Sequence, residues 1–143
     1  MAKNRNHELN DALMKLKQYV APEGHLIVSA IEARGWLIDS IDDKAIFDDD
    51  AKFISNALAL DHSSHFFVVS VFDLFHEKLP RTFPFTSNAE GVEKFQDEQW
   101  FELNLSDCIM FAPTLKGFIL RPGVVADTYI VGEKEFVLTA IGQ

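Results

Sequence analysis

The residues best suited to metal chemistry are His62 and His65, which follow directly on Asp61. Imidazole and carboxylate groups are common metal ligands, and a third ligand from a neighbouring segment would complete a facial site. Asp73 and His76 lie beyond the apolar run that starts at His65. If that run is one straight strand, at about 3.3 Å per residue, His65 and His76 are more than roughly 30 Å apart. We therefore expect capping or solvated histidines and no metal or other cofactor. A metal-dependent enzyme that uses the His62/His65 region is the alternative.

A dense run of carboxylates lies between residues 39 and 50. Its six members are Asp39, Asp42, Asp43, Asp48, Asp49 and Asp50. The run lacks the Asp-x-Asp-x-Asp-Gly order of a calcium loop. It therefore predicts either a solvated loop with a helix start or a recognition patch for a basic protein.

No nucleophilic or nucleotide-binding motif stands out. Ser63 and Ser64 lack the Gly-x-Ser-x-Gly context of an esterase nucleophile. The single cysteine, Cys108, is followed by Ile, Met and Phe, which predicts a buried, inert thiol. There is no P-loop and no Gly-x-Gly-x-x-Gly motif. We expect no catalytic residue and a protein that is not an enzyme.

The connection at residues 81–86 sets Phe83 and Phe85 on either side of Pro84. Such a loop either covers the core or forms an apolar anchor at the centre of a binding surface. In the second case the acidic rim would come from the following helix, with Glu90, Glu93, Asp97 and Glu98.

The elements that position these residues follow from apolar periodicity and turn residues. Helices are expected over residues 6–20 with Asn6 as cap, 22–34 with Pro22 first and Gly35 after the end, 48–60 with Asp48 as cap, and 87–99 with Ser87 opening a capping box. Strands are expected over residues 65–75, 100–105, 108–112, 117–121, 124–131 and 136–141. Residues 36–38 are expected to form either a brief edge strand or a plug under the helices.

The run His65–Phe75 is the most apolar of these segments and predicts a central strand that is covered on both faces. Helices that precede a meander of short strands are typical of an α+β fold. We therefore predict a single α+β domain over residues 1–143. In it, N-terminal helices pack on a mainly antiparallel sheet of about five to six strands.

The chain carries 22 acidic and 13 basic residues, for a formal net charge of −9. Such a field repels phosphate backbones, which argues against nucleic-acid binding, and attracts a basic partner. No apolar stretch reaches the roughly 20 residues that a membrane span needs, and the first residues lack a following apolar h-region, so we expect no signal peptide. We expect a cytoplasmic protein without membrane contact.

These observations predict an acidic protein-binding module. The closest analogy, of charge and size and missing catalytic motifs only, is with bacterial immunity-type inhibitors that neutralise a basic nuclease toxin. A self-associating structural module is a further alternative. A homo-oligomer is compatible with the protein-binding module and with the structural module. The expected partner-binding residues are Asp39, Asp42, Asp43, Asp48, Asp49, Asp50, Phe83, Phe85, Glu93 and Asp97.

Overall fold

The computed structural model describes residues 2–42, 46–98, 107–123 and 127–143, which adopt an α+β fold. Six strands form one antiparallel sheet in the order β1-β6-β5-β4-β2-β3. Their bounds are β1 Leu37–Ile41, β2 His65–Ser70, β3 Phe83–Thr86, β4 Cys108–Phe111, β5 Gly117–Arg121 and β6 Thr128–Gly132. The helices of the described residues are α1 Ala2–Leu16, α2 Val28–Ala33, α3 Asp48–Leu58, α4 Val71–His76, α5 Ala89–Glu98 and α6 Lys134–Ala140. The predicted fold class and the antiparallel sheet are confirmed.

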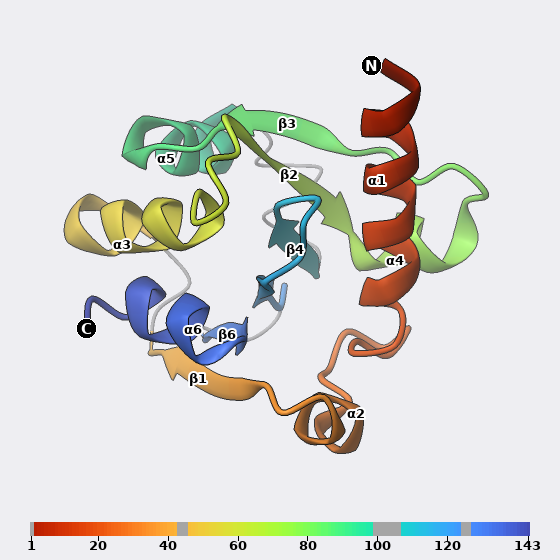
Figure 1. The fold of residues 1–143 in the computed structure, drawn as a ribbon, viewed down its shortest axis with the longest axis horizontal. Coiled ribbons are helices and arrows are strands. Elements are labelled where there is room, and N and C mark those ends of the chain that lie inside the picture. The colour runs from red at the N-terminus through yellow and green to blue at the C-terminus, as the bar shows by residue number, and fades with distance from the viewer. Residues whose placement is uncertain (1, 43–45, 99–106, 124–126) are drawn as a thin grey trace.

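Helices cover both faces of the sheet, so the molecule has three layers (Figure 1). On one face, α3, α5 and α6 pack against strand residues that include Phe66, Met110 and Ile130. On the other face, α1, α2 and α4 pack against residues that include Val69 and Phe118. Because successive strand residues point to opposite faces, β4 and β5 are buried at every position. The N-terminal helices α1 and α2 thus belong to the cover of one face only.

The prediction of a single strand from His65 to Phe75 is wrong, because the run contains a strand and then a helix. β2 ends at Ser70, whose Oγ accepts a hydrogen bond from the Asp73 N–H at 3.0 Å and caps α4. β2 is also next to the edge of the sheet, with only β3 outside it. The separation inferred for His65 and His76 from a straight strand therefore has no basis.

The segment around Pro84 is a strand and not the expected surface loop. Strand β3 pairs antiparallel with β2 and forms the outer strand on that side of the sheet. Proline is tolerated there because one side of an edge strand has no ladder partner. Phe85 is only 7% exposed, and its ring lies 5.7 Å from the rings of both Phe66 and Phe95.

The N-terminal helices differ from the prediction at their starts, and α1 also ends at Leu16, before the predicted end at residue 20. Asn6 lies inside α1 and not at its start. Pro22 lies before α2, in a turn closed by an isolated bridge between Val20 and Leu26. Gly35 follows the C-cap of α2 with a φ of 83°, which is the left-handed conformation that the sequence predicts.

The predicted caps of α3 and α5 are each displaced by one residue. Phe47 is the N-cap of α3, and Asp48 is its first residue, with a φ of 54°. The cap of α5 is Asn88 and not Ser87, because the Asn88 Oδ1 accepts a hydrogen bond from the Gly91 N–H at 2.8 Å. The helices themselves are confirmed.

The C-terminal strands are confirmed except for the last, and residues 124–126 of the strand predicted over 124–131 lie outside the described residues. β4, β5 and β6 form consecutive antiparallel pairs, and the short edge strand predicted after Gly35 is β1. Residues 136–140 belong to helix α6 and not to a strand, with Ile141 as its C-cap, because Phe136, Val137 and Ala140 share one buried helical stripe. The strand predicted over residues 100–105 lies outside the described residues.

Candidate functional site

A buried glutamine joins α5 to the segment that leads into α3. The Ile46 N–H donates to the Gln96 Oε1 at 2.8 Å, and the Gln96 Nε2 donates to the Ile46 carbonyl at 2.7 Å. A further bond from Nε2 to the Val92 carbonyl, at 3.1 Å, orients the side chain along its own helix. Gln96 is 7% exposed and Ile46 is 1% exposed. The start of α3 is therefore held firmly against α5.

This junction gathers carboxylates from two distant segments. The Asp48 N–H donates to the Glu93 Oε2 at 3.3 Å, so the first residue of α3 meets the middle of α5. Asp49 and Asp50 complete the first turn of α3, and Asp97 follows Glu93 by one helical turn on α5. We call Asp48, Asp49, Asp50, Glu93 and Asp97 the α3/α5 acidic surface. The two helices lie side by side in Figure 1.

The sequence interpretation missed the aromatic residue at this surface, Phe47. Its side chain is 46% exposed, although the residues on either side, Ile46 and Asp48, are both hydrogen-bonded to α5. An exposed aromatic ring beside carboxylates matches the anchor and rim of a protein interface. The signal in the sequence was a single Phe between an apolar residue and three aspartates, which does not distinguish a buried ring from an exposed one.

Of the two roles expected for Phe83 and Phe85, the structure favours a cover of the core over an apolar anchor. Phe85 is part of the core, and Phe83 is half-buried with the Arg81 guanidinium 5.7 Å from its ring centroid. Arg81 also pairs with Asp73 at 3.2 Å, so the charged groups at this edge are mixed in sign. Glu90 is exposed near this edge.

The other predicted partner-binding residues lie on a different part of the molecule. Asp39 is on β1, and Asp42 directly follows it; both are exposed. β1 is the outermost strand on the side of the sheet opposite β3. Asp43 lies outside the described residues. The run of carboxylates at residues 39–50 is therefore divided between a strand edge and a helix start.

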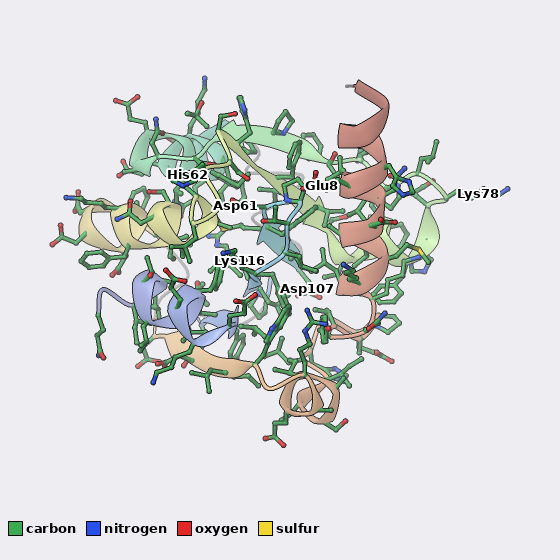
Figure 2. All side chains as sticks on the ribbon, viewed as in Figure 1. Glu8, Asp61, His62, Lys78, Asp107 and Lys116 are labelled. Atoms are coloured by element: carbon green, nitrogen blue, oxygen red, sulfur yellow. The ribbon has the colours of Figure 1, made fainter. Side chains whose placement is uncertain are left out.

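The His62/His65 region shows no metal site. Figure 2 places Asp61 and His62 on the loop that follows α3. His62 has a φ of 66°, and the His65 Nδ1 lies 3.0 Å from the Ser64 Oγ at the start of β2, so the pair does not share a helix face. Among the described residues, no group of three or more His, Cys, Asp or Glu side chains is arranged to hold a metal ion.

Asp61 instead ties the loop together. Burial raises the pKa of Asp61, but hydrogen bonds from the Thr114 hydroxyl and from Ser63 outweigh this effect and hold the pKa below its ordinary value. The Ser63 Oγ donates to Asp61 at 2.8 Å. Because Thr114 belongs to the loop between β4 and β5, the contact fastens two loops at one end of the sheet.

A buried arginine accompanies the single cysteine. Cys108 pairs with Arg121 across β4 and β5, and both are at most 2% exposed. The Arg121 guanidinium lies 4.9 Å from the centroid of the Phe95 ring and donates to the Gln96 Oε1 at 3.5 Å. Burial lowers the pKa of Arg121, and the neighbouring Cys108 offsets part of this effect. The thiol is buried, as predicted, but its surroundings are not purely apolar.

A shallow groove of about 270 Å³ lies between β3 and the first turns of α5. Its polar lining includes His65 and the oppositely charged side chains of Lys94 and Glu90. The groove does not include the α3/α5 acidic surface.

The chain matches no protein-family model, no curated protein and no solved structure at a significant level. Among the described residues, no helix has both the length and the apolar character needed to cross a membrane.

Proposed function

We propose that this protein is an acidic binding module that neutralises a basic protein partner, as an immunity-type inhibitor of a nuclease toxin does, and that it has no catalytic activity of its own. The observation that carries the proposal is the α3/α5 acidic surface. It brings the three carboxylates of the first turn of α3 beside Glu93 and Asp97 of α5, and the exposed Phe47 directly precedes them in the chain. A cationic protein surface is the natural complement of this arrangement.

The proposed binding combines long-range electrostatic attraction with short-range contacts. A net charge of −9 raises the encounter rate with a cationic partner. At contact, the carboxylates pair with basic side chains of the partner that would otherwise bind phosphate. The ring of Phe47 supplies apolar area at the centre of the interface. Aromatic anchors of this kind carry much of the binding free energy of protein interfaces.

The rigid support of the surface adds to the proposal. The hydrogen bonds between Gln96 and Ile46 hold the segment before α3 in place without help from a partner. Binding to such a surface loses little conformational entropy, so more of the interaction energy remains as affinity.

The proposal is tested by crosslinking the protein in native extract, identifying the captured partner by mass spectrometry, and titrating that partner at several salt concentrations. We expect a basic partner and an affinity that falls as salt rises. A neutral or acidic partner, or an affinity that does not change with salt, would contradict the proposal.

Charge variants localise the surface. The triple change Asp49→Asn, Asp50→Asn and Glu93→Gln should weaken binding by about tenfold or more, at roughly 0.5 kcal/mol for each rim charge, and should flatten the salt dependence. The control removes the same net charge from the other helical layer, with Glu8→Gln, Glu23→Gln and Glu32→Gln, and should change the affinity much less. Equal losses in both triples would show that only net charge matters.

A second pair of variants tests the aromatic anchor. Phe47→Ala should weaken binding by more than about 1 kcal/mol while the free energy of unfolding changes little, because the ring is exposed. Phe72, which is 64% exposed on α4, provides the matched control. If Phe72→Ala weakens binding as much as Phe47→Ala, Phe47 is not the anchor of the interface.

A further inference from the structure

One side of the sheet ends in an open strand. All five residues of β1 pair with β6, from Leu37 opposite Gly132 to Ile41 opposite Thr128. On its other side, β1 has no strand partner among the described residues, and it forms the lower border of the sheet in Figure 1. An open edge presents a row of backbone N–H and C=O groups to which a further strand can bind.

The Asp39 side chain shows which backbone groups of β1 face away from β6. The Ser40 N–H donates to the carboxylate of the preceding residue, Asp39, at 2.7 Å. In an antiparallel pair, alternate residues direct their N–H and C=O groups away from the partner strand. The bond to Asp39 assigns Ser40, and with it Ile38, to this outward set. In the isolated protein the carboxylate thus occupies a donor that an added strand would use.

β1 differs from the opposite edge strand in the residues that keep edges from pairing. The opposite edge, β3, contains Pro84 and buries Phe85. β1 contains neither proline nor lysine, and its apolar residues Leu37 and Ile38 are 43% and 37% exposed. Exposed apolar side chains on an open edge are suited to contact with an added strand.

The charges at this edge select the occupant. Asp39 and Asp42 are exposed, and Asp127 stands one residue before Thr128, which pairs with Ile41. All three side chains are acidic. A second copy of the chain bound through β1 would bring carboxylates against carboxylates, which is unfavourable. A segment that carries lysine or arginine gains ion pairs instead.

We propose that β1 binds an extended, cationic segment of a partner protein as an added strand at the edge of the sheet. On binding, the Ser40 N–H donates to a carbonyl of the incoming segment in place of the Asp39 carboxylate. The released carboxylate then pairs with a basic side chain of that segment. This inference rests on the basic partner of the proposed function, but it concerns a different surface from the α3/α5 acidic surface.

The test uses a short peptide that alternates lysine with valine, titrated into isotope-labelled protein and followed by amide NMR shifts and hydrogen exchange. We expect shifts confined mainly to residues 37–41 and slower exchange of the Ser40 amide. A peptide with alternate backbone nitrogens methylated, and one with glutamate in place of lysine, should each bind at least about tenfold more weakly. Equal binding of the methylated peptide would overturn the proposal.

Protein variants provide the second arm. Ser40→Pro removes the outward N–H at an edge position where proline is tolerated, and should weaken peptide binding by about tenfold, whereas Ser40→Ala should leave it nearly unchanged. If Ser40→Pro does not fold, the methylated peptide still decides the question. Concentration-dependent shifts of β1 without peptide would identify a second copy as the occupant and overturn the proposal.

A third variant separates this inference from the proposed function. The triple change Asp49→Asn, Asp50→Asn and Glu93→Gln should leave the peptide affinity nearly unchanged. If it abolishes peptide binding while Ser40→Pro does not, the strand edge is not the site, and the α3/α5 acidic surface binds cations by itself. If it weakens the natural partner but not the peptide, both proposals stand.

Discussion

Replacing Gln96 with Met tests how the acidic surface is supported. Met has nearly the same length and volume, so the change removes the amide and leaves no cavity. Two buried backbone groups of Ile46 lose their partners, since its N–H and its carbonyl both bond to Gln96 at 2.8 and 2.7 Å. Each of these two groups costs about 1–2 kcal/mol when left without a partner, so the free energy of unfolding should fall by roughly 2–4 kcal/mol.

Urea unfolding measures this change. For a chain of this size the denaturant slope is about 2 kcal/mol/M, so the midpoint should move down by roughly 1–2 M. The Ile46 amide should also exchange with solvent faster than in the parent protein, because it no longer has an acceptor at Gln96. The same variant should weaken partner binding, since the start of α3 is no longer held against α5.

The matched control is Gln18→Met, because Gln18 is exposed. That change should alter the free energy of unfolding by no more than about 0.5 kcal/mol. If Gln96→Met is as mild as Gln18→Met and the Ile46 amide keeps its protection, the glutamine does not hold the two helices together and our reasoning about the surface is wrong.

Three further changes test other parts of the structure. The pKa of Asp61 is lower in the folded protein than the 3.8 of an unperturbed carboxyl, so its contribution to stability is present above that value and is lost as the pH falls through the folded pKa. Thr114→Val should therefore destabilise the protein by about 0.5–1 kcal/mol at neutral pH. Urea unfolding across pH should show that the difference in unfolding free energy from the parent shrinks in strong acid. A difference that does not change with pH would contradict this. Gly91→Ala should destabilise by about 1–3 kcal/mol although alanine favours helices, because its Cβ would collide with the Thr86 carbonyl; a stabilised variant in thermal unfolding would refute that contact. Phe85→Ala should cost about 3–5 kcal/mol in urea unfolding, whereas a loss below about 1 kcal/mol would fit a ring on a surface loop.

Local patterns predicted much of the secondary structure. The antiparallel strands β4, β5 and β6 follow from short apolar runs separated by turn residues, and the inward positions Val92 and Phe95 on α5 follow from helical spacing. Gly35 was found from its place after a helical stripe. In each case the signal lies within a few neighbouring residues.

The errors have a common physical cause. A short apolar run does not reveal whether it is a strand or a helix, so α4 and α6 were both predicted as strands. The cap that separates β2 from α4 is Ser70, a small polar residue inside the longest apolar run. The segment around Pro84 was predicted as a connection, although an edge strand accepts proline because of its unpaired side. Its position at the edge depends on the pairing of β3 with β2, which the residues around Pro84 do not reveal by themselves.

The sequence alone determined the acidic net charge, the α+β class and the presence of carboxylates at residues 39–50, because these are properties of composition and local spacing. Only the tertiary structure decided which carboxylates lie together. Glu93 meets Asp48 because buried hydrogen bonds from Gln96 fix α5 against α3. The same packing buries Phe85 and leaves Phe47 exposed, since burial depends on which elements meet and not on the identity of the side chain.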